Sequence, residues 1–280
     1  MRRPFWQSLL IYCSAGLILM VTLAPIAWLV LMSVSSSQDL ITVPLPWIPK
    51  HWDFSKYAQL LDMTGYITEN PFLMALRNSL IAAFGSTLLA LVAAIPAAYA
   101  FSRRNGPMAL LFLLLATYMM PPITYVLPLY TLFSDIGMLN NPVTLIAVYC
   151  TMLLPFATWL IKSNLDVLPV EVEHAATVEG AGTMRTLVSV VLPMIRPVLM
   201  AAAMLSFLIA WDEFFYSLIF NSDLRGKTLP VAIADFAAGR VTDYGLIASV
   251  GVLASLPPTF LAVFFQRHLV QGLAAGSVKG

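Results

Sequence analysis

The sequence predicts an all-α integral membrane protein with six transmembrane helices. Of the 280 residues, 60% are hydrophobic and only 10% are charged, whereas a soluble domain carries about 25% charged residues. Six long apolar runs follow one another along the chain, and about 20 apolar residues are enough to span a bilayer as a helix. Because the backbone must satisfy its own hydrogen bonds inside lipid, each run is expected to be helical.

The expected helices belong to a single domain, residues 1–280, since no linker, internal repeat or low-complexity segment separates them. The first apolar run follows Arg2-Arg3 but is too long for a signal peptide and lacks a small-residue cleavage site, so it is expected to be a retained anchor. The third contains Pro121-Pro122 and Pro128, which is compatible with a cavity-lining helix and also with an ordinary proline kink. The six helices cover about 9–33, 72–101, 107–131, 142–163, 196–220 and 244–266.

The positive charges near the helix ends favour both termini on the cytoplasmic side, where Lys and Arg gather. In that orientation nine of them lie inside and six outside. The inside set is Arg2, Arg3, Arg103, Arg104, Lys162, Arg185, Arg196, Arg267 and Lys279, and the outside set is Lys50, Lys56, Arg77, Arg225, Lys227 and Arg240. On the outer side, residues 55–61 and 229–236 are each expected to form a short helix.

Composition and motifs argue against several functions. A net charge of +1 offers no basic stripe for nucleic acid. The three histidines are scattered without metal-ligand spacing, and no nucleophile constellation can be argued, so neither a metal site nor a catalytic site is expected. Gly180-Ala181-Gly182-Thr183 lacks the lysine of a phosphate-binding loop. The chain is therefore not expected to be an enzyme, to bind a cofactor or to hydrolyse ATP.

The most polar stretch is the loop 164–194, between the fourth and fifth helices. Glu173, His174 and Thr177 are predicted on one face of a short helix, opposite Leu168, Val172, Ala175 and Ala176. Gly180-Ala181-Gly182 ends that helix, and Thr183 can cap a second one. A structured polar loop in an oily protein indicates a contact with another molecule.

Asp212 and Glu213 are the only charges inside an apolar run, beside Trp211. A carboxylate at the centre of a membrane helix costs roughly 2.5–3.5 kcal/mol on insertion scales. Two interpretations remain open: a polar substrate path or ion relay, or an interfacial pair that stabilises helix packing. The first would suit an ion-coupled secondary transporter that uses Asp212 and Glu213.

One spacing in the polar loop resembles a known family. Ala175-Ala176, three residues, Gly180, nine residues and Val190-Val191-Leu192-Pro193 match the signature loop of ABC importer permeases. With Asn78-Ser79 opening the second helix and the ending 269–280, the chain is similar to the carbohydrate permeases, and resembles the shorter maltose-type subunit. His174 stands where that motif has a glutamate; Glu173 precedes it and Glu179 takes the place of an aspartate.

The resemblance implies a type I ABC importer permease fold and a subunit of an ATP-driven sugar or oligosaccharide importer in the bacterial cytoplasmic (inner) membrane. Its expected partners are a second permease subunit, a dimer of cytoplasmic ATPases that holds ATP and Mg, an extracytoplasmic sugar-binding protein and membrane lipid. The ATPase-coupling residues would be Glu173, His174, Ala175, Ala176, Glu179, Gly180, Leu192 and Pro193. Candidates for the substrate path are Asn78, Trp211, Asp212 and Glu213.

Overall fold

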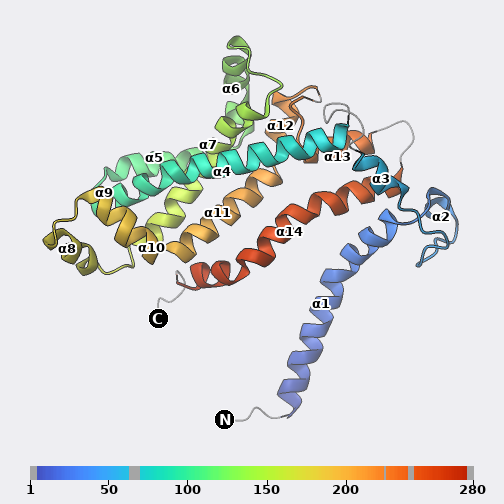
Figure 1. Ribbon diagram of the computed structural model, residues 1–280, viewed down its shortest axis with the longest axis horizontal. Helices are drawn as coiled ribbons and strands as arrows, with labels where there is room; N and C mark the ends of the chain where they lie inside the picture. Colours follow the sequence, from blue (N-terminus) through green and yellow to red (C-terminus); the bar gives the residue numbers. More distant parts are fainter. Residues whose placement is uncertain (1–4, 63–69, 224, 239–242, 276–280) are drawn as a thin grey trace. The chain divides into compact units, whose positions relative to one another are not determined.

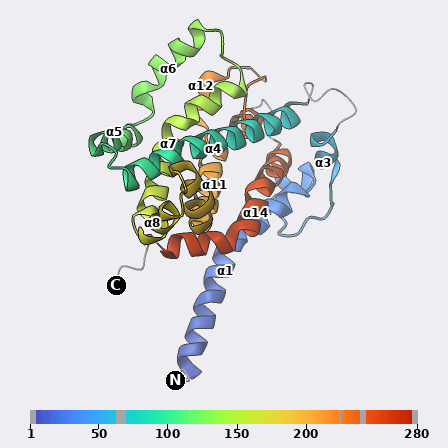
Figure 2. The same ribbon diagram turned by 60° about the vertical axis from the view of Figure 1, so that its left-hand side comes forward.

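The computed structural model describes residues 5–62, 70–223, 225–238 and 243–275, and most of these are helical (Figures 1 and 2). Among the described residues no strand occurs, only an isolated bridge between Ser35 and Trp52. The final residues 276–280 of the predicted tail lie outside the described residues. In chain order the helices are α1 (Phe5–Ser33), α2 (Ser37–Ile41), α3 (Ser55–Leu60), α4 (Pro71–Arg103), α5 (Met108–Met119), α6 (Ile123–Asp135), α7 (Pro142–Leu165), α8 (Glu171–Val178), α9 (Thr183–Thr186), the π-helical turn η2 (Leu187–Val191), α10 (Leu192–Met194), α11 (Arg196–Trp211), α12 (Phe215–Phe220), α13 (Leu229–Ala237) and α14 (Tyr244–Ala275).

Four of the described helices are long and apolar enough to cross a membrane alone: Trp6–Ser33, Pro71–Arg103, Pro142–Leu165 and Tyr244–Arg267. Two further pairs of helices, each bent at a short break, bring the number to six if each pair is one span. These pairs are α5 with α6, bent by 95°, and Thr183–Met194 with α11, bent by 81°. The all-α membrane fold predicted from the apolar runs is confirmed.

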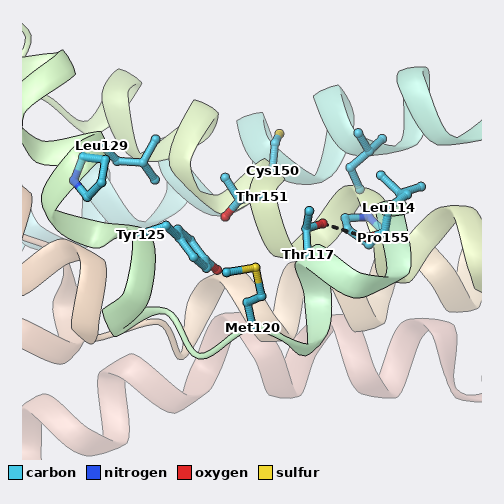
Figure 3. A pocket seen from close by; sticks show the side chains of 10 residues that line it. Leu114, Thr117, Met120, Tyr125, Leu129, Cys150, Thr151 and Pro155 are labelled. Carbon is cyan, nitrogen blue, oxygen red and sulfur yellow. Dashed lines mark hydrogen bonds between the residues drawn. The ribbon is translucent and has the colours of Figure 1, made fainter. Parts of the chain in front are cut away.

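The expected third helix, 107–131, is divided into α5 and α6. The break falls at Pro121-Pro122, which cannot donate backbone hydrogen bonds to a continuing helix. Met120, which precedes them, is extended (φ −72°, ψ 132°), as expected for a residue before proline. Beside this break lies a cavity of about 390 Å³ (Figure 3), and Met120 and Tyr125 line it together with residues of α7.

The chain groups into two compact units, each assembled from segments that are far apart in the sequence. The first contains residues 1–73 and 232–256, and the second contains 74–231 and 257–280. The limits between them fall inside helices, which is why no linker marks them in the sequence.

In the first unit, polar contacts join the C-terminal end of α1 to α3 and to the beginning of α14. The Ser249 hydroxyl donates to the carbonyl of Ser33 over 3.0 Å. Lys56 is buried, and its ammonium donates to the Ser35 carbonyl over 2.7 Å and to Asp53 over 3.3 Å. A Cβ on Gly245 would lie 2.6 Å from Lys56 Cε, so this glycine allows the lysine side chain to pass closely.

In the second unit, α7 packs against α5 and α11, and α12 packs against α6 and α7. Helix α4 also lies close to α7: a Cβ on Gly85 would lie 2.4 Å from Ile146 Cδ1. Three fully buried alanines, Ala90, Ala94 and Ala98, follow on the same helix. Small residues of this kind let membrane helices approach closely.

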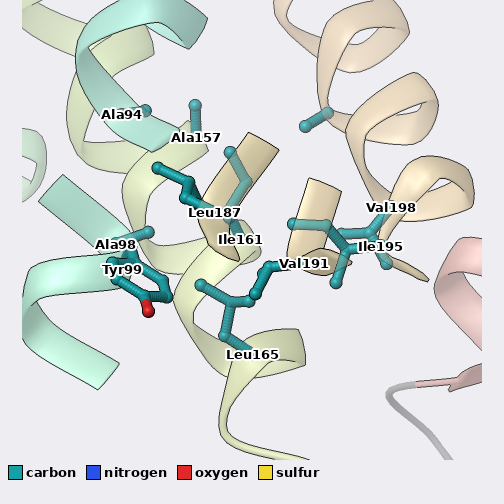
Figure 4. Close-up of a cluster of buried hydrophobic side chains, with 11 residues drawn as sticks. Ala94, Ala98, Tyr99, Ala157, Ile161, Leu165, Leu187, Val191, Ile195 and Val198 are labelled. Carbon is teal, nitrogen blue, oxygen red and sulfur yellow. The ribbon is translucent and has the colours of Figure 1, made fainter. Parts of the chain in front are cut away.

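The core of the second unit is an apolar cluster that includes part of the polar loop (Figure 4). Leu187, Val191 and Ile195, from the loop segment that leads into α11, pack among side chains of three long helices. Those side chains are Ala94, Ala98 and Tyr99 of α4, Ala157, Ile161 and Leu165 of α7, and Val198 and Ala202 of α11. The second half of the loop is thus an integral part of the core.

Candidate functional site

Helix α8 is the exposed part of the loop 164–194, and the residues at its two ends determine where it begins and where it stops. Two acidic residues, Glu171 and Glu173, occupy its first turn, where the helix dipole favours negative charge. At its other end the Gly180 N–H donates to the Thr177 carbonyl and the Ala181 N–H to the Ala176 carbonyl, each over 3.0 Å. This is the Schellman pattern, and it places Gly180 at φ +85°.

Glu173 points into the chain and is held there by two contacts with the end of α4. Arg103 Nε donates to Glu173 Oε1 over 2.7 Å, and the Tyr99 hydroxyl donates to Oε2 over 2.9 Å. The Arg103 guanidinium also donates to the Leu168 carbonyl over 2.9 Å. Only 8% of the Arg103 side chain and 10% of the Glu173 side chain are exposed. We call this set of contacts, Tyr99–Arg103–Glu173, the α4–α8 latch.

A second polar tie joins the ends of α4 and α7 beside the latch. The Ser102 hydroxyl and the Lys162 ammonium each donate to Asp166 over 2.6 Å. Burial raises the pKa of the Asp166 carboxyl, but the hydrogen bonds from Lys162 and Ser102 outweigh it and hold that pKa below its usual value. Asp166 therefore stays ionised, and the tie persists, at any pH above its ordinary pKa.

The exposed surface of α8 differs from the polar face predicted for it, which comprised Glu173, His174 and Thr177. Glu173 is buried, whereas His174, Ala175 and Glu179 are exposed, and Ala176 is half-buried. Glu173 and His174 are the two residues that could stand for the motif glutamate, and only His174 faces outward.

Three further residues that the resemblance assigns to ATPase coupling lie before and after the segment formed by α9 and η2. Gly180 is exposed at the turn after α8, Leu192 is half-buried, and Pro193 is exposed in α10. Val178, the last residue of α8, is 89% exposed. The tip of α8 is therefore accessible, while the segment behind it is packed in the core.

Sequence reasoning missed Tyr99 and Arg103 as members of this site. Arg103 entered only as one of the positive charges that indicate orientation. Its partner is 70 residues away in the chain, and no local pattern reveals such a pairing. The sequence did contain one indication of this pairing: Glu173 lies in the same loop as an apolar segment. A carboxylate that is buried together with such a segment needs a cation as its partner.

The candidate substrate-path residues differ in burial and in hydrogen-bond partners. Asn78 is fully buried, and its amide donates to the carbonyls of Arg225 and Lys227 over 3.0 Å each. Trp211 is buried at the end of α11, and Asp212 is exposed. Asn78 thus fixes the segment before α13 from the start of α4.

Glu213 caps a helix. Its two carboxylate oxygens accept the backbone N–H groups of Tyr216, over 2.8 Å, and Ser217, over 3.2 Å. These belong to the first turn of α12, whose backbone donors have no partner within the helix. The geometry supports the packing interpretation of this carboxylate over the relay interpretation.

Replacing Glu213 with Ala should therefore lower stability by about 1 kcal/mol, as loss of a helix cap does, and leave transport per folded molecule unchanged. Asp212→Ala, at the exposed neighbour, is the matched control and should change neither quantity. Thermal unfolding in detergent measures the first quantity, and uptake in liposomes measures the second. Uptake abolished in Glu213→Ala at unchanged stability would place this carboxylate on the path instead.

The cavity beside the α5–α6 break is apolar and does not suit a polar solute. Two hydroxyls that line it, on Thr117 and Thr151, donate to carbonyls of their own helices, Leu114 and Val148. Figure 3 shows the Tyr125 ring among these side chains. A sugar site needs convergent polar groups, so this cavity does not define one.

Together, the apolar helices and the latched loop define a helical membrane protein with one structured polar loop. Comparison with known proteins gives the family: the chain belongs to the inner membrane components of binding-protein-dependent transport systems, whose family model matches residues 86–275. It is a multi-pass inner membrane protein and a permease component of an ABC importer, not an enzyme, and the predicted family resemblance is confirmed.

Two relatives match nearly the whole chain. A sulfoquinovosyl glycerol transport system permease protein of Agrobacterium fabrum is 31% identical over 271 residues, covering 96% of this chain and 93% of its own. A trehalose/maltose transport system permease protein of Thermococcus litoralis is 30% identical over 287 residues, covering 100% of both. Among solved structures, a chain of a bacterial ABC transporter involved in import of the acidic polysaccharide alginate superposes with a TM-score of 0.76 at 18% identity, covering 95% of this chain and 99% of that one. This likeness confirms the importer permease fold.

Proposed function

We propose that this chain forms half of the translocation pathway of a sugar or oligosaccharide importer and receives the motion of a cytoplasmic ATPase through the loop 164–194. The α4–α8 latch is the observation that carries the proposal. Because α8 is ion-paired to the long membrane helix α4, a displacement of α8 would also displace α4. The carbohydrate class is supported by the relatives, which are named for sulfoquinovosyl glycerol and trehalose/maltose transport.

In this proposal, ATP and Mg bind a dimer of ATPase subunits, and this chain binds no cofactor. Closure of the dimer pushes on α8 near Val178 and His174. The latch passes the displacement to α4, and the packing of Leu187 and Val191 passes it to α7 and α11. Because packed interiors deform little, these helices respond together and change access to a pathway shared with a second permease subunit.

The proposal also places both termini and the loop 164–194 on the cytoplasmic side, and residues 34–71 and 221–243 outside. The outer segments would receive an extracytoplasmic sugar-binding protein. Arg103, Arg104, Lys162 and Arg185 cluster at the ends of α4 and α7 and in the loop, which agrees with the excess of Lys and Arg on the cytoplasmic side of membrane proteins.

The test is reconstitution of the complete assembly in liposomes with a panel of sugars. We expect uptake of a sugar that requires both ATP on the ATPase side and the binding protein on the other side. Chain incorporated without the ATPase should take up nothing. Uptake by the chain alone, driven by a proton or sodium gradient, would contradict the proposal.

A further inference from the structure

A second pocket lies behind α8, beside the latch, and its volume is about 350 Å³. Three elements of the second unit form it: the end of α4, the inner face of α8 and the beginning of α9. Its lining includes Tyr99, Arg103, Arg104, Glu173, His174 and Thr183. His174 of α8 and Thr183 of α9, both exposed, border it, so the pocket is accessible from outside the chain.

The charges around this pocket leave an excess of positive charge. Arg103 and Glu173 neutralise each other in the latch at 2.7 Å. Arg104 remains, and among the described residues that line the pocket Glu173 is the one carboxylate. Arg104 donates to the Thr183 hydroxyl, but a guanidinium has five N–H donors and can also take a carboxylate in a bidentate pair.

His174 adds to this preference. It is an exposed residue that lines the pocket, and it brings an imidazole rather than a carboxylate. An imidazole is neutral or positive and never negative. A basic side chain of a partner would be repelled by Arg104 at this pocket. Among the described lining residues, no exposed carboxylate would offset that repulsion.

We propose that the pocket is a receptor for an acidic side chain of the ATPase, whose carboxylate pairs with Arg104 beside His174. This inference rests on the proposed function, because it names the contact through which the ATPase engages the loop. It assigns Arg104 and His174 to partner recognition, and Arg103 and Glu173 to positioning α8. The polarity of this contact would be the reverse of a carboxylate on the permease docking against a basic ATPase residue.

The experiment uses the assembled complex with the variant Arg104→Lys, which supplies an amine in the pocket. A carbodiimide then joins that amine to any carboxylate in direct contact, and mass spectrometry identifies the linked residue. We expect a link to an Asp or Glu of the ATPase. The matched control is Arg185→Lys, an exposed position on α9 that does not line the pocket, and it should not link to that same residue.

A complementary measurement does not depend on cross-linking. Arg104→Gln should weaken binding of the purified ATPase to the permease by at least roughly tenfold, because removing one partner of a hydrogen-bonded charge pair at an interface leaves the other charge unpaired, whereas Arg185→Gln should change it less than twofold. His174→Glu should weaken it in the same direction as Arg104→Gln.

Three outcomes would overturn the inference while leaving the proposed function intact. One is an assembly that imports sugar with ATP but yields no link, or a link only to Glu173 of this chain. Another is ATPase affinity unchanged in Arg104→Gln. A third is binding of inorganic phosphate, or of vesicles of anionic lipid, that is lost in Arg104→Gln with ATPase affinity unchanged. Absence of ATP-driven uptake in the unsubstituted assembly would instead contradict the proposed function itself.

Discussion

Replacing Arg103 with Gln should uncouple the transporter. The change leaves the Glu173 carboxylate buried without its cation, and removing one partner of a buried ion pair costs about 3–5 kcal/mol. Release of α8 from α4 would expose the Glu173 carboxylate to water and so remove this cost. We expect sugar-stimulated ATP hydrolysis in the assembled complex to fall by at least about tenfold, which corresponds to only about 1.4 kcal/mol of lost coupling. Hydrolysis without sugar should persist.

Two controls separate this effect from general damage. In the double variant Arg103→Gln with Glu173→Gln no unpaired charge is buried, so part of the loss should be recovered, as expected when both partners of a pair are replaced. Lys162→Gln removes a more exposed ion pair at the same membrane side, Lys162–Asp166, and exposed pairs contribute at most about 1 kcal/mol. If Lys162→Gln reduced stimulated hydrolysis as strongly as Arg103→Gln, the latch would have no special role.

Replacing Gly180 with Val should have the second-largest effect. Gly180 has φ +85° and no neighbouring atom within 4 Å of an added Cβ, so the cost is conformational rather than steric crowding by neighbours. An L-residue in the left-handed region costs about 1–2 kcal/mol, and a β-branched one is especially unfavourable there. The Schellman turn that ends α8 would open, and we expect loss of sugar-stimulated hydrolysis with normal membrane insertion.

The loop offers its own controls for this prediction. Gly182 has an ordinary φ of −72° and no atom within 4 Å of an added Cβ, so Gly182→Ala should be nearly silent. Gly180→Asn should retain most of the coupling, since Asn tolerates positive φ better than other residues. Equal activities for Gly180→Val and Gly182→Ala would show that the shape of this turn does not matter for coupling.

Much of the fold could be predicted because its determinants are local. Long apolar runs specify membrane helices through the hydrogen-bonding demand of the backbone in lipid. The two short outer segments expected to be helical, 55–61 and 229–236, coincide with α3 and α13. The bend between α5 and α6 follows from Pro121-Pro122, although the sequence did not show that the chain would turn by 95° there.

The site was less predictable because its contacts join residues that are far apart in the chain. Periodicity predicted Glu173 on a polar face of α8, but an ion pair with Arg103 lets this carboxylate face inward. Asn78 is likewise explained only by carbonyls 147 and 149 residues away. The helix cap formed by Glu213 could have been predicted from the sequence, because its partners lie only three and four residues later.

Cross-linking from Val178, which is 89% exposed, tests whether the ATPase acts on the membrane helices through α8. A Val178→Cys variant, in a chain with Cys13 and Cys150 replaced by Ala, can carry a maleimide–benzophenone probe in the reconstituted, active assembly. We expect a photoproduct with the ATPase, and sugar uptake that falls in proportion to the yield of that product. An assembly that imports sugar with ATP, gives no ATPase product from this position and is not inhibited by the probe would contradict this expectation.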